Sequence, residues 1–498
     1  MSLKSLLSKP IARRTFRRVR MAAKRAVQDQ DAVLRKITAQ AMHTSFGKDH
    51  DFKSIYSHQD LVDRVPLRDY EALKPYIERV VAGEENVLWP GKPVYLAKTS
   101  GTTSGAKYIP ISRQSVGHHV NAAKNALLCF IAKSGKATWV GGKMIFLQGS
   151  PVLELKGDIP IGRLSGITAH WIPKYLQKNR LPSWETNCIE DWEEKVEKVV
   201  EETKVENMTL ISGIPSWLQM YFERLLDKTG RNNVSEVFPN LELLVYGGVN
   251  FEPYRSKFKQ LIGRDIPTVE TYPASEGFIA YQDDYTQPGL LLNTNAGMYF
   301  EFVPANEIFN ENPTRLNLAE VELNVNYAII LHTNAGLWGY NIGDTVKFVS
   351  LKPFRVVVTG RIKHFTSAFG EHVIAEEVEE AIVETLDLHA ASINEFHLAP
   401  QVSPKDSSLP YHEWFISFEE EPANMDKFRL DLDKALQTKN PYYLDLIEGS
   451  ILQTLKITKC GSQTFRAMME ERGKLGGQNK VPRLANDRNI AQILEKHL

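Results

Sequence analysis

The sequence predicts an α/β protein with a large N-terminal body, built of parallel-rich sheets with helices plus a β subdomain, and a small α+β C-terminal domain. Its 498 residues suffice for about three folding units. Short apolar runs alternate with helix-like stretches between residues 95 and 249, which indicates βαβ units. Turn-rich strands follow at residues 289–349, and a mixture of strands and helices comes after them. We expect the body at residues 1–349 and a mobile C-terminal domain at residues 350–498.

The first 80 residues are expected to form a basic helical segment. Residues 1–28 contain nine Lys or Arg and no Asp or Glu. A membrane-surface arm and an organelle transit peptide both fit this pattern. We favour a solvated amphipathic helix that packs its large apolar side chains on the body. Those side chains are Leu3, Leu6, Leu7, Ile11 and Phe16.

The remaining elements are predicted from apolar runs of strand or helix length. In the parallel part, strands are expected at 144–147, 208–211 and 241–246, and helices at 189–204 and 215–226. In the turn-rich part, strands are expected at 290–293, 298–303, 320–325 and 327–333. The C-terminal domain should contain strands at 355–359, 414–418 and 452–457 and helices at 375–386 and 424–436.

Composition narrows the class of protein. Sixty Lys and Arg balance sixty Asp and Glu, so no overall positive charge favours nucleic acid as the main partner. Three scattered cysteines are too few for a disulfide framework or a zinc cluster, which favours a cytoplasmic location. No apolar run approaches the roughly 20 residues of a transmembrane helix. The sequence does not specify an oligomeric state.

The most informative segment is Thr99-Ser100-Gly101-Thr102-Thr103-Ser104-Gly105-Ala106-Lys107, directly after the apolar run at 94–97. Its glycines let backbone N–H groups converge on an anion, its hydroxyls add donors, and Lys107 supplies positive charge. This pattern is typical of phosphate binding, although the Gly-Lys-Ser/Thr ending of a Walker A loop is missing. A flexible surface turn is the alternative.

The segment Glu270-Thr271-Tyr272-Pro273-Ala274-Ser275-Glu276-Gly277 places a carboxylate and an aromatic ring in a turn. Glu276 suits Mg²⁺ bound to a nucleotide, because that ion takes one or two protein carboxylates and keeps water and phosphate oxygens as its other ligands. The ring of Tyr272 suits a purine base. Solvated or capping residues are the alternative.

Two further segments carry single charged residues. In Tyr340-Asn341-Ile342-Gly343-Asp344, the aspartate follows a glycine turn and can accept both hydroxyls of a ribose, which Arg361 can also reach. In Gly476-Gly477-Gln478-Asn479-Lys480-Val481-Pro482-Arg483, the lysine can neutralise charge that develops on a phosphate. A common Gly-Asp turn and a solvated loop lysine are the alternatives.

Taken in order, these segments resemble the core motifs of the adenylate-forming superfamily. The closest resemblance is to the auxin-responsive acyl acid-amido synthetases and their bacterial relatives. It is carried by Tyr76-Ile77-Glu78-Arg79, by Gly83 to Gly91, by Tyr272 to Gly277, and by Gly476 to Arg483, which is similar to the family's Asn-Gln-Tyr-Lys-x-Pro-Arg ending. Pro273, Gly277 and Asn479 depart from the residues usual in plant members.

The resemblance implies a ligase that uses ATP and Mg²⁺. An acid and ATP would give an acyl-adenylate and pyrophosphate, and an amine, most simply an amino acid, would then give an amide and AMP. The resemblance places Ser100, Gly101, Thr102, Thr103 and Lys107 at the phosphates, Tyr272 and Ser275 in the nucleotide site, Glu276 at Mg²⁺, Asp344 and Arg361 at the ribose, and Lys480 at the reacting phosphate. It also implies that the C-terminal domain rotates between the two half-reactions.

The acyl pocket is less well defined. Trp217, Met220 and Tyr221 fall where superfamily members often line that pocket, and a buried amphipathic helix accounts for them equally well. Gly248 fits either the adenine site or a plain turn after a strand. The rival functions are an acyl-CoA ligase, a non-catalytic nucleotide-binding sensor, and a membrane-surface or nucleic-acid adaptor that uses the basic N-terminal segment.

Overall fold

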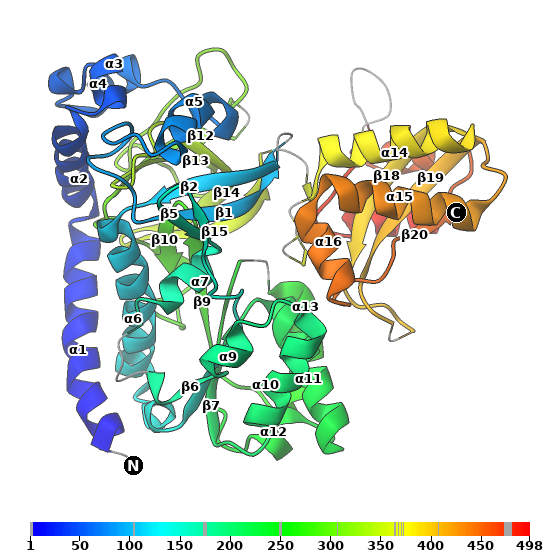
Figure 1. The fold of residues 1–498 in the computed structure, drawn as a ribbon, viewed down its shortest axis with the longest axis horizontal. Coiled ribbons are helices and arrows are strands. Elements are labelled where there is room, and N and C mark those ends of the chain that lie inside the picture. Colours follow the sequence, from blue (N-terminus) through cyan, green and yellow to red (C-terminus); the bar gives the residue numbers. More distant parts are fainter. Residues whose placement is uncertain are drawn as a thin grey trace.

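The computed structural model describes residues 3–102, 105–172, 177–248, 251–305, 307–362, 365–366, 368–369, 371, 373–406, 408–472 and 481–498. Figure 1 shows a large body, with α1 along its outer edge, and a smaller C-terminal part beside it. This arrangement confirms the predicted α/β fold class with a small α+β C-terminal domain.

The body is organised around one mixed sheet whose eleven described strands lie in the order β12-β13-β14-β15-β11-β10-β9-β8-β7-β3-β6. The five strands from β9 to β6 run parallel, and the others pair antiparallel. The parallel strands are β3 (Lys143–Phe146), β6 (Arg180–Leu181), β7 (Met208–Gly213), β8 (Leu243–Gly247) and β9 (Thr268–Ala274). The antiparallel strands are β10 (Gly277–Tyr281), β11 (Leu290–Leu292), β12 (Met298–Pro304), β13 (Asn326–Thr333), β14 (Tyr340–Leu351) and β15 (Phe354–Arg361).

Two strand predictions disagree with the observed structure of this sheet. Residues 320–325 form no strand, since only Leu323 makes an isolated bridge, to Phe348. The strand expected at 355–359 exists as β15, but it pairs with β14 and β11 in the main sheet rather than in the C-terminal domain. The sheet therefore includes the chain to Arg361, while the domain boundary at residue 349 stays a prediction.

A smaller sheet carries residues Thr99 to Lys107, called here the hydroxyl-glycine segment. Its order is β2-β1-β5-β4, with β1 (Tyr95–Thr102), β2 (Gly105–Ile111), β4 (Glu154–Lys156) and β5 (Ile159–Gly162). β1 and β2 pair as an antiparallel hairpin in which Thr99 lies opposite Lys107. Figure 1 shows the free end of this hairpin directed towards the C-terminal domain.

Helices cover both sheets. The N-terminal segment contains α1 (Leu3–Lys24), α2 (Ala26–Ala41), α3 (Ser45–Asp49), η1 (Phe52–Ser54), α4 (His58–Arg64) and α5 (Tyr70–Val81). The rest of the body contains α6 (Arg113–Ser134), η2 (Thr138–Gly141), α7 (Leu164–Ala169), α9 (Trp184–Asn187), α10 (Trp192–Thr203), α11 (Pro215–Thr229), α12 (Val234–Val237) and α13 (Glu252–Ile262). No helix in the described part of the chain has the length and apolar character needed to cross a bilayer.

For α1, the predicted packing on the body is confirmed for Phe16 and wrong for Leu6, Leu7 and Ile11. Its buried face consists of smaller residues, namely Ser5, Ser8, Ala12, Thr15 and Val19. Leu6, Leu7 and Ile11, which we expected to pack on the body, are 57%, 58% and 55% exposed. Small side chains allow a helix to approach its neighbour closely, and Leu6, Leu7 and Ile11 are left on its outer face.

The C-terminal domain contains a three-stranded sheet, β18-β19-β20, and its helices. The predicted helices correspond to α14 (Ala375–His389) and α15 (Met425–Lys439). The remaining elements are β16 (Phe365–Thr366), β17 (Val373–Ile374), β18 (Ser392–Gln401), β19 (Tyr411–Glu420), α16 (Pro441–Glu448), β20 (Lys456–Lys459), α17 (Thr464–Glu471) and α18 (Asn489–Lys496).

Helix α16 joins this domain to the smaller sheet of the body. Asp445 forms an ion pair with Arg163, the residue directly after β5. The Arg163 guanidinium also lies 5.3 Å from the centroid of the Tyr442 ring, and the Tyr442 hydroxyl lies 3.5 Å from the carbonyl oxygen of Lys98. The C-terminal domain therefore contacts the strands that carry the hydroxyl-glycine segment.

Gly247 provides a test of how tightly β8 and β9 pack. A Cβ atom at Gly247 would lie 2.3 Å from the carbonyl oxygen of Thr271, a backbone atom that cannot move aside cheaply. Gly247→Ala should therefore lower the free energy of unfolding by about 2 kcal/mol, as measured by urea denaturation. In the control Gly117→Ala, in α6, a Cβ meets nothing within 4 Å, and stability should rise by about 1 kcal/mol. Equal effects would contradict this account of the packing.

Candidate active site

The hydroxyl-glycine segment forms the end of the β1–β2 hairpin. Ser100, Gly101 and Thr102 are the last residues of β1, and Thr102 pairs with Gly105. The side chains of Ser100 and Thr102, and the whole of Thr103, lie outside the described residues. The chain is extended up to Thr102 in β1 and again from Gly105 in β2.

Strand β2 of this hairpin is held by α5. The backbone N–H of Tyr108 donates a 2.9 Å hydrogen bond to the hydroxyl of Tyr70. The ammonium group of Lys107 lies 5.7 Å from the centroid of the same tyrosine ring, within the range of a cation–π contact. Lys107 is thus half-buried beside Tyr70, at the foot of the predicted phosphate site.

The second predicted segment is the end of β9 and its turn into β10. Tyr272 is buried in β9, whereas Ser275 and Glu276 form the turn and are half-buried. The neighbouring strand β8 ends at Gly247, and Gly248 follows with a φ of +87° that favours glycine. Because β8 and β9 are parallel neighbours, these residues lie at the same edge of the sheet.

A direct contact joins the segment that contains Tyr272 to the segment that contains Asp344. The hydroxyl of Tyr272 donates a 2.6 Å hydrogen bond to Oδ2 of Asp344, although 72 residues separate them. The approach to Asp344 is shaped by Gly343, which has a φ of +85° and whose N–H donates to Oδ1 of Asn341. A buried tyrosine and a buried carboxylate from two distant segments are therefore in direct contact.

Arg361 lies directly across from Asp344. The two residues are paired in the register of β14 and β15, and the N–H of Ile362 donates to the carbonyl oxygen of Gly343 at 2.8 Å. The side chain of Arg361 lies outside the described residues. The backbone pairing nevertheless brings two of the predicted ribose-binding residues to one position of the sheet.

The candidate pocket residues lie on α11 and differ from one another in their surroundings. Tyr221 is fully buried and its hydroxyl lies 2.7 Å from Oγ1 of Thr203, on α10. Burial raises the pKa of this phenol. Trp217 and Met220 are half-buried. The surroundings of Tyr221 match the alternative of a buried amphipathic helix, and a pocket role for the three residues stays a prediction.

Lys480 lies outside the described residues. The chain directly after it is fixed to β18 of the C-terminal domain. The N–H of Leu398 donates to the carbonyl oxygen of Arg483 at 2.9 Å, and Nδ1 of His397 lies 2.6 Å from the carbonyl oxygen of Pro482. Pro482 and Arg483 are thus fixed to this small domain.

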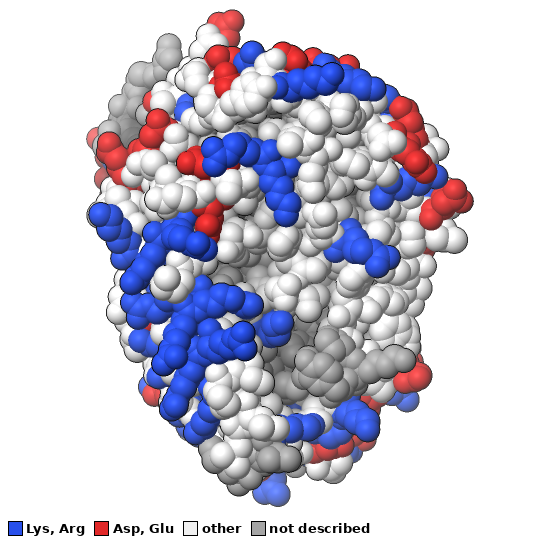
Figure 2. All heavy atoms as spheres, turned by 90° about the vertical axis from the view of Figure 1, so that its left-hand side faces the viewer, with Lys and Arg blue, Asp and Glu red and all other residues white. Residues whose placement is uncertain are grey.

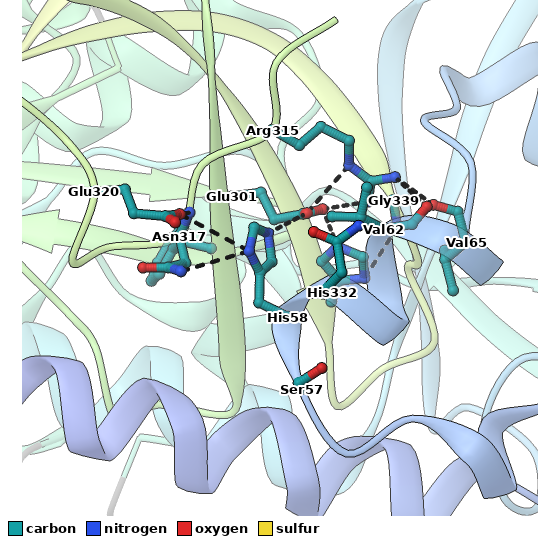
Figure 3. A network of polar contacts seen from close by, with 12 residues as sticks. Ser57, His58, Val62, Val65, Glu301, Arg315, Asn317, Glu320, His332 and Gly339 are labelled. Carbon is teal, nitrogen blue, oxygen red and sulfur yellow. Dashed lines mark hydrogen bonds and ion pairs between the residues drawn. The ribbon is translucent and has the colours of Figure 1, made fainter. Parts of the chain in front are cut away.

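A buried ionic cluster on β12 and β13 was not predicted. Glu301, in β12, is fully buried and is surrounded by three basic side chains from different segments (Figure 3). Its carboxylate lies 2.7 Å from Nε2 of His332 in β13 and 2.9 Å from Nε2 of His58 in α4. Arg315 approaches both carboxylate oxygens, at 2.6 Å and 3.1 Å. The relevant signal, isolated polar residues within apolar strands, is too common to identify such a cluster from sequence.

The charges of this cluster follow from its hydrogen bonds. Nδ1 of His332 accepts the N–H of Gly339 at 3.2 Å, so Nε2 carries the proton that is donated to Glu301. Burial lowers the pKa of His332 and keeps the ring neutral. Burial by itself raises the pKa of the Glu301 carboxyl, but the contacts with the two histidines and Arg315 outweigh it and hold this pKa well below its usual range. Glu301 is therefore an anion that is hydrogen-bonded by His332 and His58 and forms an ion pair with Arg315.

The cluster also fixes the start of β14, the strand that carries Asp344. Its member His332 binds the N–H of Gly339, whose carbonyl oxygen accepts the N–H of Arg68 at 2.7 Å. Arg68 forms a parallel bridge with Tyr340, the first residue of β14. On the same turn, the indole N–H of Trp338 donates to the carbonyl oxygen of Leu88 at 3.0 Å. The residues Gly83 to Gly91 thus help to hold the strand of the candidate ribose site.

The chain matches the three domains of one protein family, in order. Residues 15–186 match the GH3 family N-terminal domain, residues 291–361 the central domain, and residues 376–489 the C-terminal domain. The central domain ends where β15 ends, at Arg361. The chain belongs to the GH3 family, and the resemblance to the acyl acid-amido synthetases stated from the sequence is confirmed.

Two curated relatives are similar over different lengths. Jasmonoyl–L-amino acid synthetase JAR4 of Nicotiana attenuata is 23% identical over 57% of this chain and 60% of its own length. Jasmonoyl–L-amino acid synthetase GH3.5 of Oryza sativa subsp. japonica is 21% identical over 87% of this chain and 88% of its own length. The match therefore spans less than two thirds of the Nicotiana protein and most of the rice protein.

A solved structure shows the same fold. The GH3.15 acyl acid amido synthetase aligns with a TM-score of 0.61 and 14% identity, covering 97% of this chain and 96% of that one. The likeness extends across both the body and the C-terminal domain.

Glu301→Gln should weaken the ionic cluster, because it removes the negative charge and leaves Arg315 buried without its counter-ion. We expect the free energy of unfolding to fall by about 3 kcal/mol, measured by urea denaturation at neutral pH. The control is Glu320→Gln, since Glu320 is half exposed and lies 3.9 Å from His58, and its loss should stay below about 0.5 kcal/mol. A small effect of Glu301→Gln would refute the role given to this cluster.

Because of this cluster, the free energy of unfolding should also decrease as the pH is lowered. Because the folded pKa of His332 is below its ordinary value of 6.5, the unfolded state takes up the proton first, and stability is lost as pH falls below about 6.5. The folded pKa of Glu301 is also depressed, so its contribution is complete above about pH 4.5 and is lost as pH falls further.

Denaturation at a series of pH values measures this dependence. Burial likewise lowers the pKa of His119 and His397 to about 4, so these residues add to the slope. His332→Gln should make the free energy of unfolding depend less steeply on pH between about pH 6.5 and 5 than it does in the wild type. An unchanged slope would show that His332 does not contribute.

Proposed function

We propose that this protein is an ATP-dependent acyl acid-amido synthetase. It activates a carboxylic acid as an acyl-adenylate and then transfers the acyl group to an amine, most simply that of an amino acid. The observation that carries the proposal is the 2.6 Å contact between Tyr272 and Asp344, because it unites two motifs far apart in sequence at one edge of the sheet. Membership of the GH3 family supports it, since relatives of this family are named as amido synthetases. The cytoplasm is the proposed location.

In the proposed site, the nucleotide extends from the sheet edge to the β1–β2 hairpin. The ring of Tyr272 lies against adenine, with Gly248 and Ser275 beside it. Asp344 and Arg361 bind the ribose, and the phosphates lie at Ser100, Gly101, Thr102, Thr103 and Lys107. The hydroxyl of Tyr272 donates to Oδ2 of Asp344, so the two residues proposed for the base and the ribose lie in direct contact.

Mg²⁺ fits this donor set as an ion held mainly by the nucleotide. Among the described residues, no group of three His, Cys, Asp or Glu side chains is arranged to hold a metal by itself. Glu276, in the turn after β9, offers one carboxylate, which is the number typical for Mg²⁺ bound to phosphates. When bound, the ion would neutralise phosphate charge.

The chemistry consists of two displacements. A carboxylate oxygen of the acid attacks the α-phosphorus of ATP, the bond to the β-phosphate oxygen breaks, and pyrophosphate leaves. The amine nitrogen then attacks the acyl carbonyl, loses a proton, and displaces AMP. Because the first step brings two anions together, alignment and charge neutralisation are the main tasks of the protein. Lys480 is proposed to neutralise charge in this first step.

Carboxylate-dependent exchange of labelled pyrophosphate into ATP tests the proposal. A panel of aryl and aliphatic acids should contain at least one that supports exchange, and product mass should then identify an amide when amino acids are supplied. Formation of a thioester with coenzyme A instead would favour an acyl-CoA ligase. The absence of exchange with every acid, combined with ATP binding, would favour a nucleotide sensor.

Tyr272 and Asp344 should affect ATP use to different extents. Asp344→Ala removes the ribose acceptor and should lower kcat/KM for ATP in the exchange assay by about 10²-fold. Tyr272→Phe keeps the ring and loses only the hydrogen bond to Asp344, so the KM for ATP should rise roughly fivefold with little change in kcat. Tyr285→Phe, on an exposed tyrosine of the body, serves as the control. Wild-type kinetics in Asp344→Ala would exclude the ribose assignment.

Lys480→Ala should reduce adenylation far more than amide formation. The expected loss is about 10²-fold in pyrophosphate exchange, whereas transfer from a chemically prepared acyl-adenylate should change little. Lys474→Ala, six positions before Lys480 and just before the glycine-rich segment, is the matched control. Equal losses in the two half-reactions would contradict the role given to Lys480.

A further inference from the structure

The outer face of α1 has an unusual composition for a helix on the surface of a protein. Its N-terminal half exposes Leu6, Leu7 and Ile11, together with Pro10. Large apolar side chains grouped on one exposed face indicate an interaction surface. The opposite face is already used, since Ser8, Ala12 and Thr15 are buried there.

Basic side chains continue this face along the helix. Arg13, Arg14, Arg17 and Arg18 are exposed and follow the apolar group by one to two turns. Arg18 donates a 3.1 Å hydrogen bond to Asn125, and within the described part of the chain no ion pair involves any of the four arginines. Figure 2, which faces α1 and α2, shows Lys and Arg side chains gathered on the lower left of this face, where few Asp or Glu are visible.

The shape of this face is that of a rod lying on the outside of the molecule. α1 contains 22 residues and spans about 33 Å, and Figure 1 shows it along the outer edge of the body. Nothing in the described chain covers its outer side in that view. A flat partner can therefore contact the apolar and the basic parts of the helix at the same time.

We propose that α1 docks this protein on an anionic lipid bilayer, with the helix lying in the plane of the interface. Leu6, Leu7 and Ile11 enter the boundary between headgroups and acyl chains, and the arginines contact lipid phosphates. An interfacial helix of this kind combines buried apolar side chains with basic residues that are attracted to anionic lipid. A nucleic acid would satisfy the arginines alone and leave the leucines exposed to water, so the lipid surface accounts for more of the face.

Vesicle flotation with the full chain tests this proposal. The protein should float with vesicles of phosphatidylcholine and phosphatidylserine, fail to float with phosphatidylcholine alone, and be released as salt is raised. Each basic residue near an anionic surface raises binding about fivefold, so Arg13→Gln, Arg14→Gln, Arg17→Gln and Arg18→Gln combined should lower the partition coefficient at least 100-fold. A second variant, Leu6→Gln, Leu7→Gln and Ile11→Gln, should reduce it with the charge unchanged.

A matched control removes the same charge elsewhere. Lys198, Lys228, Arg231 and Lys259 are exposed on or beside α10, α11 and α13, and their combined change to Gln should leave flotation intact. All three variants should keep wild-type melting temperatures and wild-type pyrophosphate exchange in the absence of vesicles. That exchange is the readout of the proposed function, so lipid docking and catalysis can fail separately.

Three outcomes would overturn the proposal. The first is the absence of binding dependent on phosphatidylserine in the wild type. The second is tight binding to duplex DNA or RNA that the leucine variant retains, which would identify a nucleic-acid surface. The third is a dimer in sedimentation that the leucine variant converts to a monomer, which would identify this face as an interface between two copies of the chain.

Discussion

The buried carboxylate of Glu301 is the constraint on which the arrangement of the N-terminal half depends. A charge with no exposure to solvent is tolerated only where it is paired and hydrogen-bonded, and its partners come from α4, from β13 and from the segment after β12. Arg315 also donates to the carbonyl oxygen of Val65 at 2.6 Å, at the end of α4. Helix α4 is thereby fixed to the antiparallel half of the sheet, and the beginning of β14 is fixed with it.

The fold and the motifs were largely predictable because both depend on local patterns. Runs of apolar residues gave the strands of the parallel half, and the order of the four segments gave the family. The hydrogen bond between Tyr272 and Asp344 was not predictable as such, although both residues were selected for the nucleotide site. What sequence reasoning lacked was pairing: it assigned β15 to the wrong sheet, because a strand's partners are set by contacts distant in sequence.

The packing of α1 shows why hydrophobicity alone can mislead. We assigned Leu6, Leu7 and Ile11 to the interior because they are the larger apolar residues of the helix. The structure buries Ser5, Ser8, Ala12, Thr15 and Val19 instead, which recur at helical spacing and are small enough for close packing. The buried Glu301 cluster was missed for a related reason, since isolated polar residues in apolar strands carry no local signal of their partners.

The end of β15 has a consequence for any movement of the C-terminal domain. Ile362 still bonds to Gly343, the neighbour of Asp344, so the backbone remains part of the sheet for one residue past Arg361. If the C-terminal domain rotates as the resemblance implies, a pivot beyond Ile362 would leave this hydrogen bond intact. A nucleoside held by Asp344 would then lie on the body side of that pivot. It would keep its position while rotation of the smaller domain replaced one set of side chains over the nucleotide with another.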